Sequence, residues 1–320
     1  IIGDKFISRE NSILLGGFLL CIGHLSLAIR QEFFFFLGLS LIILGVGLLK
    51  PNISTLVGSL YKKDDEKRDQ GFTIFYIGIN VGAFLASILV GFVGEVFGWH
   101  FGFSLAGIGM IIGQFFFIKG KRNLELYSNI SYKRIKPIKS TLKFSYKEID
   151  RIKLIIIASL ILIIFWASFE QAGGLMNIYA FEKTNRYIGY FDFEIPASWF
   201  QSVNPLLIII LGYSISELWI YLKKRGIICS SILKIAIGLI IMGLGFVFMT
   251  FASNEANIFG KSSMHWLCLA YLFHTIGELC ASPVILSYIT KLSPKKLVAS
   301  IMGIYFAAIG LGNKLAGLIG

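Results

Sequence analysis

The chain has 320 residues, of which 56% are hydrophobic and only 15% are charged, and its mean hydropathy is +0.75. Soluble domains carry about 25% charged residues, so this composition excludes an ordinary soluble protein and favours a polytopic membrane protein, whose lipid-facing surface tolerates few ions. The net charge of +12 does not indicate nucleic-acid binding, because the basic residues lie between apolar runs and set membrane topology.

Nine apolar runs are long enough to cross a membrane, since a spanning helix needs about 20 mostly apolar residues. In chain order they cover 11–30, 33–60, 71–94, 100–118, 152–181, 197–222, 228–252, 264–289 and 297–318. The longest polar stretch, 119–153, is rich in Lys, and we expect it to be a cytoplasmic linker. The predicted domains are therefore an N-terminal helical bundle (1–118), the linker (119–153) and a C-terminal helical bundle (154–320).

The basic residues between the runs predict the orientation. Twenty-three of the 30 Lys and Arg residues lie in segment 1–10 and in every second connection after it, whereas the alternate connections hold only Arg30, Lys183, Arg186 and Lys261. Because cytoplasmic loops carry the excess of Lys and Arg, the first set is predicted to be cytoplasmic. The pattern and the absence of a targeting sequence indicate a multi-pass protein of a bacterial cytoplasmic membrane.

The sequence shows no signature of an enzyme. GxSxG, HExxH and phosphate-loop motifs are absent. The four cysteines lie inside apolar runs without zinc-like spacing, which is typical of small packing residues. We therefore predict no catalytic residues, no metal site and no cofactor.

Three charged residues stand out deep within apolar runs, where charge is costly and functional roles are common. Lys50 is about 15 Å from the cytoplasmic end of its run, and the neighbouring Pro51 is expected to bend the helix and free a carbonyl. Lys50 either faces a cavity or belongs to a structural ion pair. Glu170 is about as deep, so it is either a proton site or gate, or part of a static buried pair. Glu278 either binds a substrate ammonium group or is a neutral acid hydrogen-bonded to a neighbouring helix.

Deep amide and imidazole side chains are more ambiguous. Asn80 and Asn204 either connect helices or contact a ligand, and the residue type alone favours the first role. His24 and His274 lie within apolar runs, and neither is assigned a proton role. One lysine and two glutamates near mid-membrane imply a polar cavity that would suit a zwitterion.

Several longer motifs resemble one transporter family. The run from Phe72 to Phe84 (FTIFYIGINVGAF) looks like the signature of the proton-dependent oligopeptide transporter family, within the major facilitator superfamily. Further motifs resemble the family's fourth, seventh, eighth and tenth helices: 47–54 (GLLKPNIS), 165–174 (FWASFEQAGG), 196–205 (PASWFQSVNP) and 277–287 (GELCASPVILS). The match numbers the nine runs as the family's third to eleventh helices. We therefore expect a two-bundle all-α membrane transporter, as a fragment without the first helix, most of the second and the twelfth.

The resemblance implies proton-coupled import of di- and tripeptides by alternating access, with no cofactor beyond the proton gradient and with a monomeric protein. Glu170 would couple protons to gate closure. Lys50 would bind the peptide carboxylate or the acids of the family's first helix, and Asn80, Asn204 and Glu278 would hold the peptide backbone and amino end. Trp166, Tyr305 and Phe306 would line side-chain pockets.

The chain also departs from the family pattern. The acidic-and-arginine motif of the family's first helix is not present, and 119–153 is too polar and short for the two extra helices of many bacterial members. At Tyr305 the family commonly has Trp. The alternatives are another proton-coupled solute on the same scaffold, such as nitrate or a modified peptide, and a truncated product that does not transport.

Overall fold

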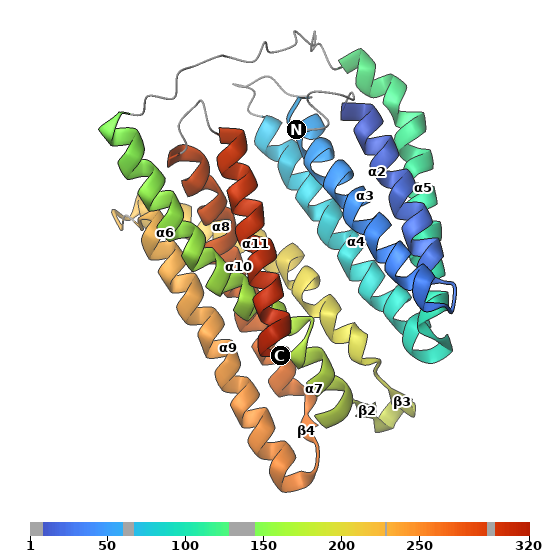
Figure 1. Cartoon of the computed structure of the whole chain (residues 1–320). Helices are drawn as coiled ribbons and strands as arrows, with labels where there is room; N and C mark the ends of the chain where they lie inside the picture. The colour runs from blue at the N-terminus through green and yellow to red at the C-terminus, as the bar shows by residue number, and fades with distance from the viewer. Residues whose placement is uncertain (1–8, 60–66, 128–144, 228, 293–297) are drawn as a thin grey trace. The chain divides into compact units, whose positions relative to one another are not determined.

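The computed structural model of the protein describes residues 9–59, 67–127, 145–227, 229–292 and 298–320 (Figure 1). The chain divides into two compact units, 1–138 and 139–320. Helices dominate both units, as the high hydropathy requires, because a helix satisfies its backbone hydrogen bonds internally within a lipid bilayer.

The first unit contains four described helices: α2 (Arg9–Leu27), α3 (Glu32–Ser59), α4 (Lys67–Phe97) and α5 (Trp99–Tyr127). Helix α2 packs against α3 and α5, and α4 packs against α5. Helix α5 extends nine residues into the segment expected as a linker. This extension contains Lys, Arg, Leu and Glu, which are good helix formers. Residues 128–144 of that segment lie outside the described residues.

The second unit contains five long helices and several short elements. The long helices are α6 (Tyr146–Phe169), α8 (Val203–Lys224), α9 (Ser231–Phe259), α10 (Met264–Leu292) and α11 (Val298–Ile319). The short elements are η1 (Glu170–Ala172), α7 (Leu175–Lys183), β1 (Thr184–Asn185), β2 (Tyr187–Ile188), η2 (Gly189–Phe191), β3 (Phe193–Glu194), η3 (Ala197–Ser202) and β4 (Ser262–Ser263).

The predicted all-α membrane fold is confirmed. Within the described residues, eight helical segments are long and apolar enough to cross a membrane, and α11 adds a shorter apolar stretch, Ile304–Ile319. One predicted run differs in its detail. The run at 152–181 is not one helix, because α6 ends at Phe169 and α7 begins only at Leu175. Gly173 and Gly174 lie in the interruption, where their low helix propensity favours a break.

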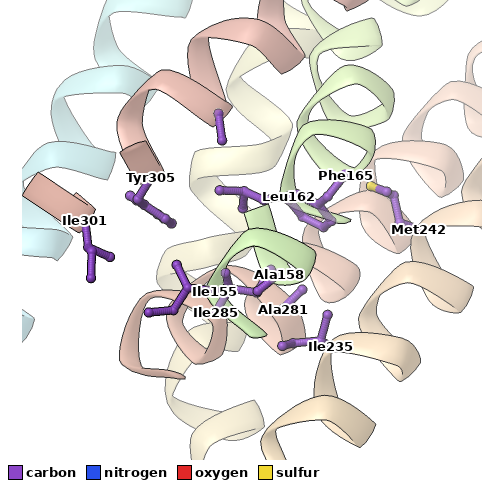
Figure 2. Close-up of a cluster of buried hydrophobic side chains, with 11 residues drawn as sticks. Ile155, Ala158, Leu162, Phe165, Ile235, Met242, Ala281, Ile285, Ile301 and Tyr305 are labelled. Atoms are coloured by element: carbon purple, nitrogen blue, oxygen red, sulfur yellow. The ribbon is translucent and has the colours of Figure 1, made fainter. Parts of the chain in front are cut away.

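The core of the second unit is a cluster of buried apolar side chains from four helices (Figure 2). Helix α6 supplies the centre, with Leu162 and Phe165 fully buried. Side chains of α9, α10 and α11 surround them. The same cluster includes Tyr305 on α11.

Glycines allow two helix pairs to cross closely, in the same register in each unit. A Cβ on Gly16 of α2 would lie 2.7 Å from the carbonyl oxygen of Gly45 on α3, and a Cβ on Gly238 of α9 would lie 2.7 Å from that of Gly277 on α10. Seven residues after Gly16 and Gly238, Gly23 and Gly245 make the second close contact of each pair. Such small residues let membrane helices approach at their backbones.

Two short sheets lie at the ends of α7 and α10. Strand β1 pairs in parallel with β4, and β2 pairs with β3 as an antiparallel hairpin. Arg186 precedes the hairpin and is buried; its guanidinium forms an ion pair with Glu194 (2.9 Å) and donates to the carbonyl of Ile195.

Candidate functional site

Glu170 lies at the interruption between α6 and α7, which Figure 1 shows as two separate helical segments. Its backbone carbonyl accepts hydrogen bonds from the amides of Gly173 (3.1 Å) and Gly174 (3.3 Å), which closes a tight turn. The Glu170 side chain is half-buried. Interrupted membrane helices commonly form substrate and ion sites in transporters, because they expose backbone groups and carry flexible joints.

Asn204 and Glu278 come together from neighbouring helices. The Nδ2 atom of Asn204 on α8 donates to Oε2 of Glu278 on α10 (2.9 Å) and to Oγ1 of Thr275 (3.0 Å). Glu278 is 9% exposed and Thr275 is completely buried. These groups therefore form one polar site within the second unit, which we call the Asn204–Glu278 site.

The three aromatic candidates occupy different surroundings. Trp166 is half-buried on α6, where it contacts the rings of Phe165 and Phe169 and approaches Gly312 of α11. Tyr305 is buried in the apolar core, with its ring 5.3 Å from that of Phe306. The side chain of Phe306 is exposed.

Lys50 and Asn80 belong to the first unit. Lys50 lies on α3, which remains helical through Lys50 and Pro51. Asn80 is buried on α4, and its Nδ2 donates to the carbonyl of Tyr76 in the same helix (3.0 Å). This bond uses one donor of the amide, so its second donor and its carbonyl oxygen are the groups that a ligand would meet.

Three further residues belong to this region although sequence reasoning did not select them. Gln201 of η3 and Tyr271 of α10 both bond to the carbonyl of Ala172, and Thr275 bonds to Asn204. Helical spacing could have found them. Tyr271 and Thr275 precede Glu278 by seven and three residues, and Gln201 precedes Asn204 by three, which places each near the same helix face.

The arrangement defines a class of protein. A multi-pass helical membrane protein with a half-buried carboxylate at an interrupted helix and a buried carboxylate on a neighbouring one has the architecture of a solute transporter. The chain belongs to the POT family, because the sequence model of that family matches residues 10–145 and 122–320. The resemblance found in the motifs is thereby confirmed.

Characterised relatives are similar along nearly the whole chain. Peptide transporter YePEPT of Yersinia enterocolitica is 33% identical, over 100% of this chain and 75% of the relative. A di-/tripeptide transporter of Lactococcus lactis subsp. cremoris is also 33% identical, over 96% of this chain and 73% of the relative. These relatives are transporters rather than enzymes.

Solved structures agree with this assignment. A mutant of a peptide transporter POT in complex with alafosfalin has a TM-score of 0.87 and 31% identity, covering 99% of this chain and 74% of that one. A POT family transporter in complex with a thioalcohol-conjugated peptide has a TM-score of 0.86 and 27% identity, covering 99% of this chain and 76% of that one.

Proposed function

We propose that the protein imports di- and tripeptides together with protons across a bacterial cytoplasmic membrane, as a monomer that works by alternating access. The observation that carries the proposal is the Asn204–Glu278 site beside the interrupted helix at Glu170. The peptide and di-/tripeptide transporters among the relatives support the substrate class.

The Asn204–Glu278 site suits the amino end of a peptide. The Glu278 carboxylate accepts one hydrogen bond from Asn204 and retains lone pairs for an ammonium group. Charge-assisted hydrogen bonds of this kind are about twice as strong as neutral ones. Lys50 binds the substrate carboxylate, and Asn80 and Asn204 bind the peptide backbone. Trp166, Tyr305 and Phe306 contribute to side-chain pockets, with Tyr305 becoming accessible as α11 moves.

Glu170 carries the coupled proton in this proposal. The carboxylate takes up a proton from the outer side when the site is open there, and releases it to the cytoplasm after the protein has changed state. Neutralising Glu170 also removes its repulsion of Glu278, which favours closure of the site. The two helical bundles, 1–118 and 154–320, are the moving parts, and 119–153, which continues α5 and begins α6 at its ends, connects them.

A second candidate is another solute that carries both an amine and an acid. A POT family structure in complex with 5-aminolevulinic acid, 27% identical to this chain, favours this alternative over an inorganic anion such as nitrate. Nitrate would leave the Glu278 carboxylate without a cationic partner, whereas a zwitterion would not.

The test uses the complete gene product in proteoliposomes, with labelled dialanine outside and an inward proton gradient. We expect gradient-driven accumulation in the wild type and a loss of about tenfold or more in Glu170→Gln. Exchange of dialanine without a gradient should survive in that variant, because exchange needs no net proton movement.

Glu217→Gln provides the matched control, since Glu217 is an exposed carboxylate on α8 of the same unit. Accumulation that persists in Glu170→Gln would move the proton site elsewhere. A folded protein that takes up 5-aminolevulinic acid but not dialanine would establish the second candidate instead.

A further inference from the structure

The carbonyl of Ala172 lies in the interruption of the α6–α7 span, two residues after Glu170. A carbonyl at a helix end has no intrahelical donor and needs a partner when it is buried. Two side chains provide that partner. Gln201 donates from Nε2 (2.6 Å) and Tyr271 donates from its hydroxyl (3.0 Å).

Gln201 and Tyr271 also bond to each other, because Nε2 of Gln201 lies 3.0 Å from the hydroxyl oxygen of Tyr271. Tyr271 is 1% exposed and Ala172 is also buried. The three groups thus form a closed triangle, in which Tyr271 and Ala172 are buried and Gln201 is half-buried. Breaking one edge of such a network leaves buried polar groups unpaired, so it resists small displacements of the interruption.

The triangle is one helical turn from the Asn204–Glu278 site on both of its supporting elements. Asn204 follows Gln201 by three residues, and Thr275 follows Tyr271 by four. Thr275 donates its hydroxyl to the carbonyl of Tyr271 (2.7 Å) while accepting from Asn204. The contact of Gln201 with Tyr271 and the contacts of Asn204 with Thr275 and Glu278 therefore lie on consecutive turns of η3–α8 and α10, so a shift of one turn displaces the next.

We propose that Gln201 and Tyr271 are positioning residues that link the interruption beside Glu170 to the Asn204–Glu278 site. When the interruption changes shape, the Ala172 carbonyl displaces Gln201 relative to Tyr271. The next turn of η3–α8 then moves Asn204 relative to Thr275 and Glu278, which both lie on α10. This inference rests on the proposed function for its consequence, which is that proton binding at Glu170 is transmitted to the peptide site.

The first test is Tyr271→Phe in the complete gene product, which removes one hydroxyl and keeps the ring in the core. We expect gradient-driven accumulation of dialanine to fall about tenfold, whereas exchange without a gradient stays within about twofold of wild type. A merely structural role would lower both rates together. Tyr179→Phe is the matched control, because the Tyr179 hydroxyl donates to Ser262 (3.0 Å), away from the interruption.

Combining Tyr271→Phe with Glu170→Gln tests whether the two residues act in one step. If they do, the double variant should accumulate no less dialanine than Glu170→Gln alone, since the linked step is already lost. Gln201→Met should behave as Tyr271→Phe does. Equal accumulation in Tyr271→Phe and Tyr179→Phe would overturn the proposal.

Hydrogen exchange supplies a readout that does not depend on the substrate. The amides of Gly173 and Gly174 bond to the Glu170 carbonyl, so weakening the triangle should speed their exchange by about tenfold in Tyr271→Phe and not in Tyr179→Phe. Unchanged hydrogen exchange at Gly173 and Gly174 would contradict the positioning role even if dialanine proved not to be the substrate. Faster hydrogen exchange in Tyr271→Phe, together with no dialanine uptake by the wild type, would reject the peptide function and keep the positioning role.

Discussion

At the scale of single residues, Asn204 is the hydrogen-bond partner of the Glu278 carboxylate. Its amide is the hydrogen-bond donor to a side chain that is only 9% exposed. Asn204→Leu removes that donor, and an unpaired buried polar group costs about 1–3 kcal/mol. We expect a lower melting temperature and dialanine affinity reduced by about tenfold or more, measured by thermal unfolding and by binding calorimetry.

Two variants define what would count as a specific effect of Asn204. Thr275→Val removes the other acceptor of the amide but leaves Glu278 paired, so its loss of affinity should be smaller. Asn254→Leu changes an exposed amide on α9 and should have no effect. If Asn204→Leu binds dialanine as tightly as Asn254→Leu, the amide has no role at the substrate site.

Tyr187 gives a prediction about pH outside the membrane-spanning segments. Its hydroxyl donates to the carboxylate of Asp192, and this bond raises the pKa of Tyr187 above the ordinary value of about 10. Because the neutral phenol is the donor, the bond stabilises the β2–β3 hairpin below about pH 10, and this contribution is lost as the pH rises through the raised pKa.

Titration of ring-labelled tyrosine by NMR tests this prediction, with the Tyr187 signal assigned from Tyr187→Phe. Asp192→Asn should return the Tyr187 pKa toward its ordinary value. Glu194→Gln is the control, because Glu194 pairs with Arg186, and it should change the Tyr187 pKa less. An unchanged pKa in Asp192→Asn would show that the hydrogen bond is not the cause.

The sequence singled out two polar residues that the structure brings together, Asn204 and Glu278, more readily than the residues around them. Glu278 and Asn204 could be selected because charge and amide side chains are rare in apolar runs. Gln201 and Tyr271 share helix faces with these residues, but helical spacing alone does not give their role, which depends on a carbonyl that becomes unpaired only where the helix breaks. Tyr305 was expected at a pocket, and it is buried in the core.

At the scale of helices, the two glycine crossings show that one packing pattern is used twice. Gly16 and Gly45 correspond to Gly238 and Gly277, and the same spacing places His274 where α3 has Ile42. Pro51 and Pro283 also correspond, because each lies six residues after the glycine of its helix, Gly45 on α3 and Gly277 on α10. The polar residues break this repeat, because Lys50 corresponds to Ser282.

His274 is the unfavourable member of the α9–α10 crossing. It is 1% exposed, it contacts the ring of Phe246, and neither ring nitrogen has a hydrogen-bond partner among the described residues. His274→Ile, which copies the other crossing, should raise the free energy of unfolding by about 1–3 kcal/mol, seen as a higher melting temperature in detergent.

The reciprocal change provides the control for His274. Ile42→His places an imidazole in the α2–α3 crossing and should lower the melting temperature, by less than the His274→Ile change raises it because Ile42 is only half-buried. A melting temperature that falls in His274→Ile would show that the imidazole forms a stabilising hydrogen bond in the folded protein. It would then be reasonable to test His274 for a proton role.

At the scale of the whole molecule, hydropathy located the long helices of the described residues but not the break within one of the predicted runs. The nine apolar runs match the described helices because each must satisfy its backbone within lipid. Periodicity did not reveal the division into α6 and α7, since the interruption at Glu170–Gly174 depends on glycines and on side chains from η3 and α10. The end of α5 was also missed, because a charged sequence can remain helical beyond the membrane.

Membrane orientation is the largest-scale prediction, and the basic residues make it testable at two exposed positions. Lys224 ends α8 in a connection predicted to be cytoplasmic, and Lys261 lies between α9 and β4 in one predicted to be external. Single cysteines at these sites, in a background without the four native cysteines, should react differently with an impermeant maleimide on intact cells. Lys261→Cys should be labelled directly and Lys224→Cys only after permeabilisation, because the excess of Lys and Arg stays in the cytoplasm. Labelling in the opposite order would reverse the orientation, and Glu170 would then take up its proton from the cytoplasmic side.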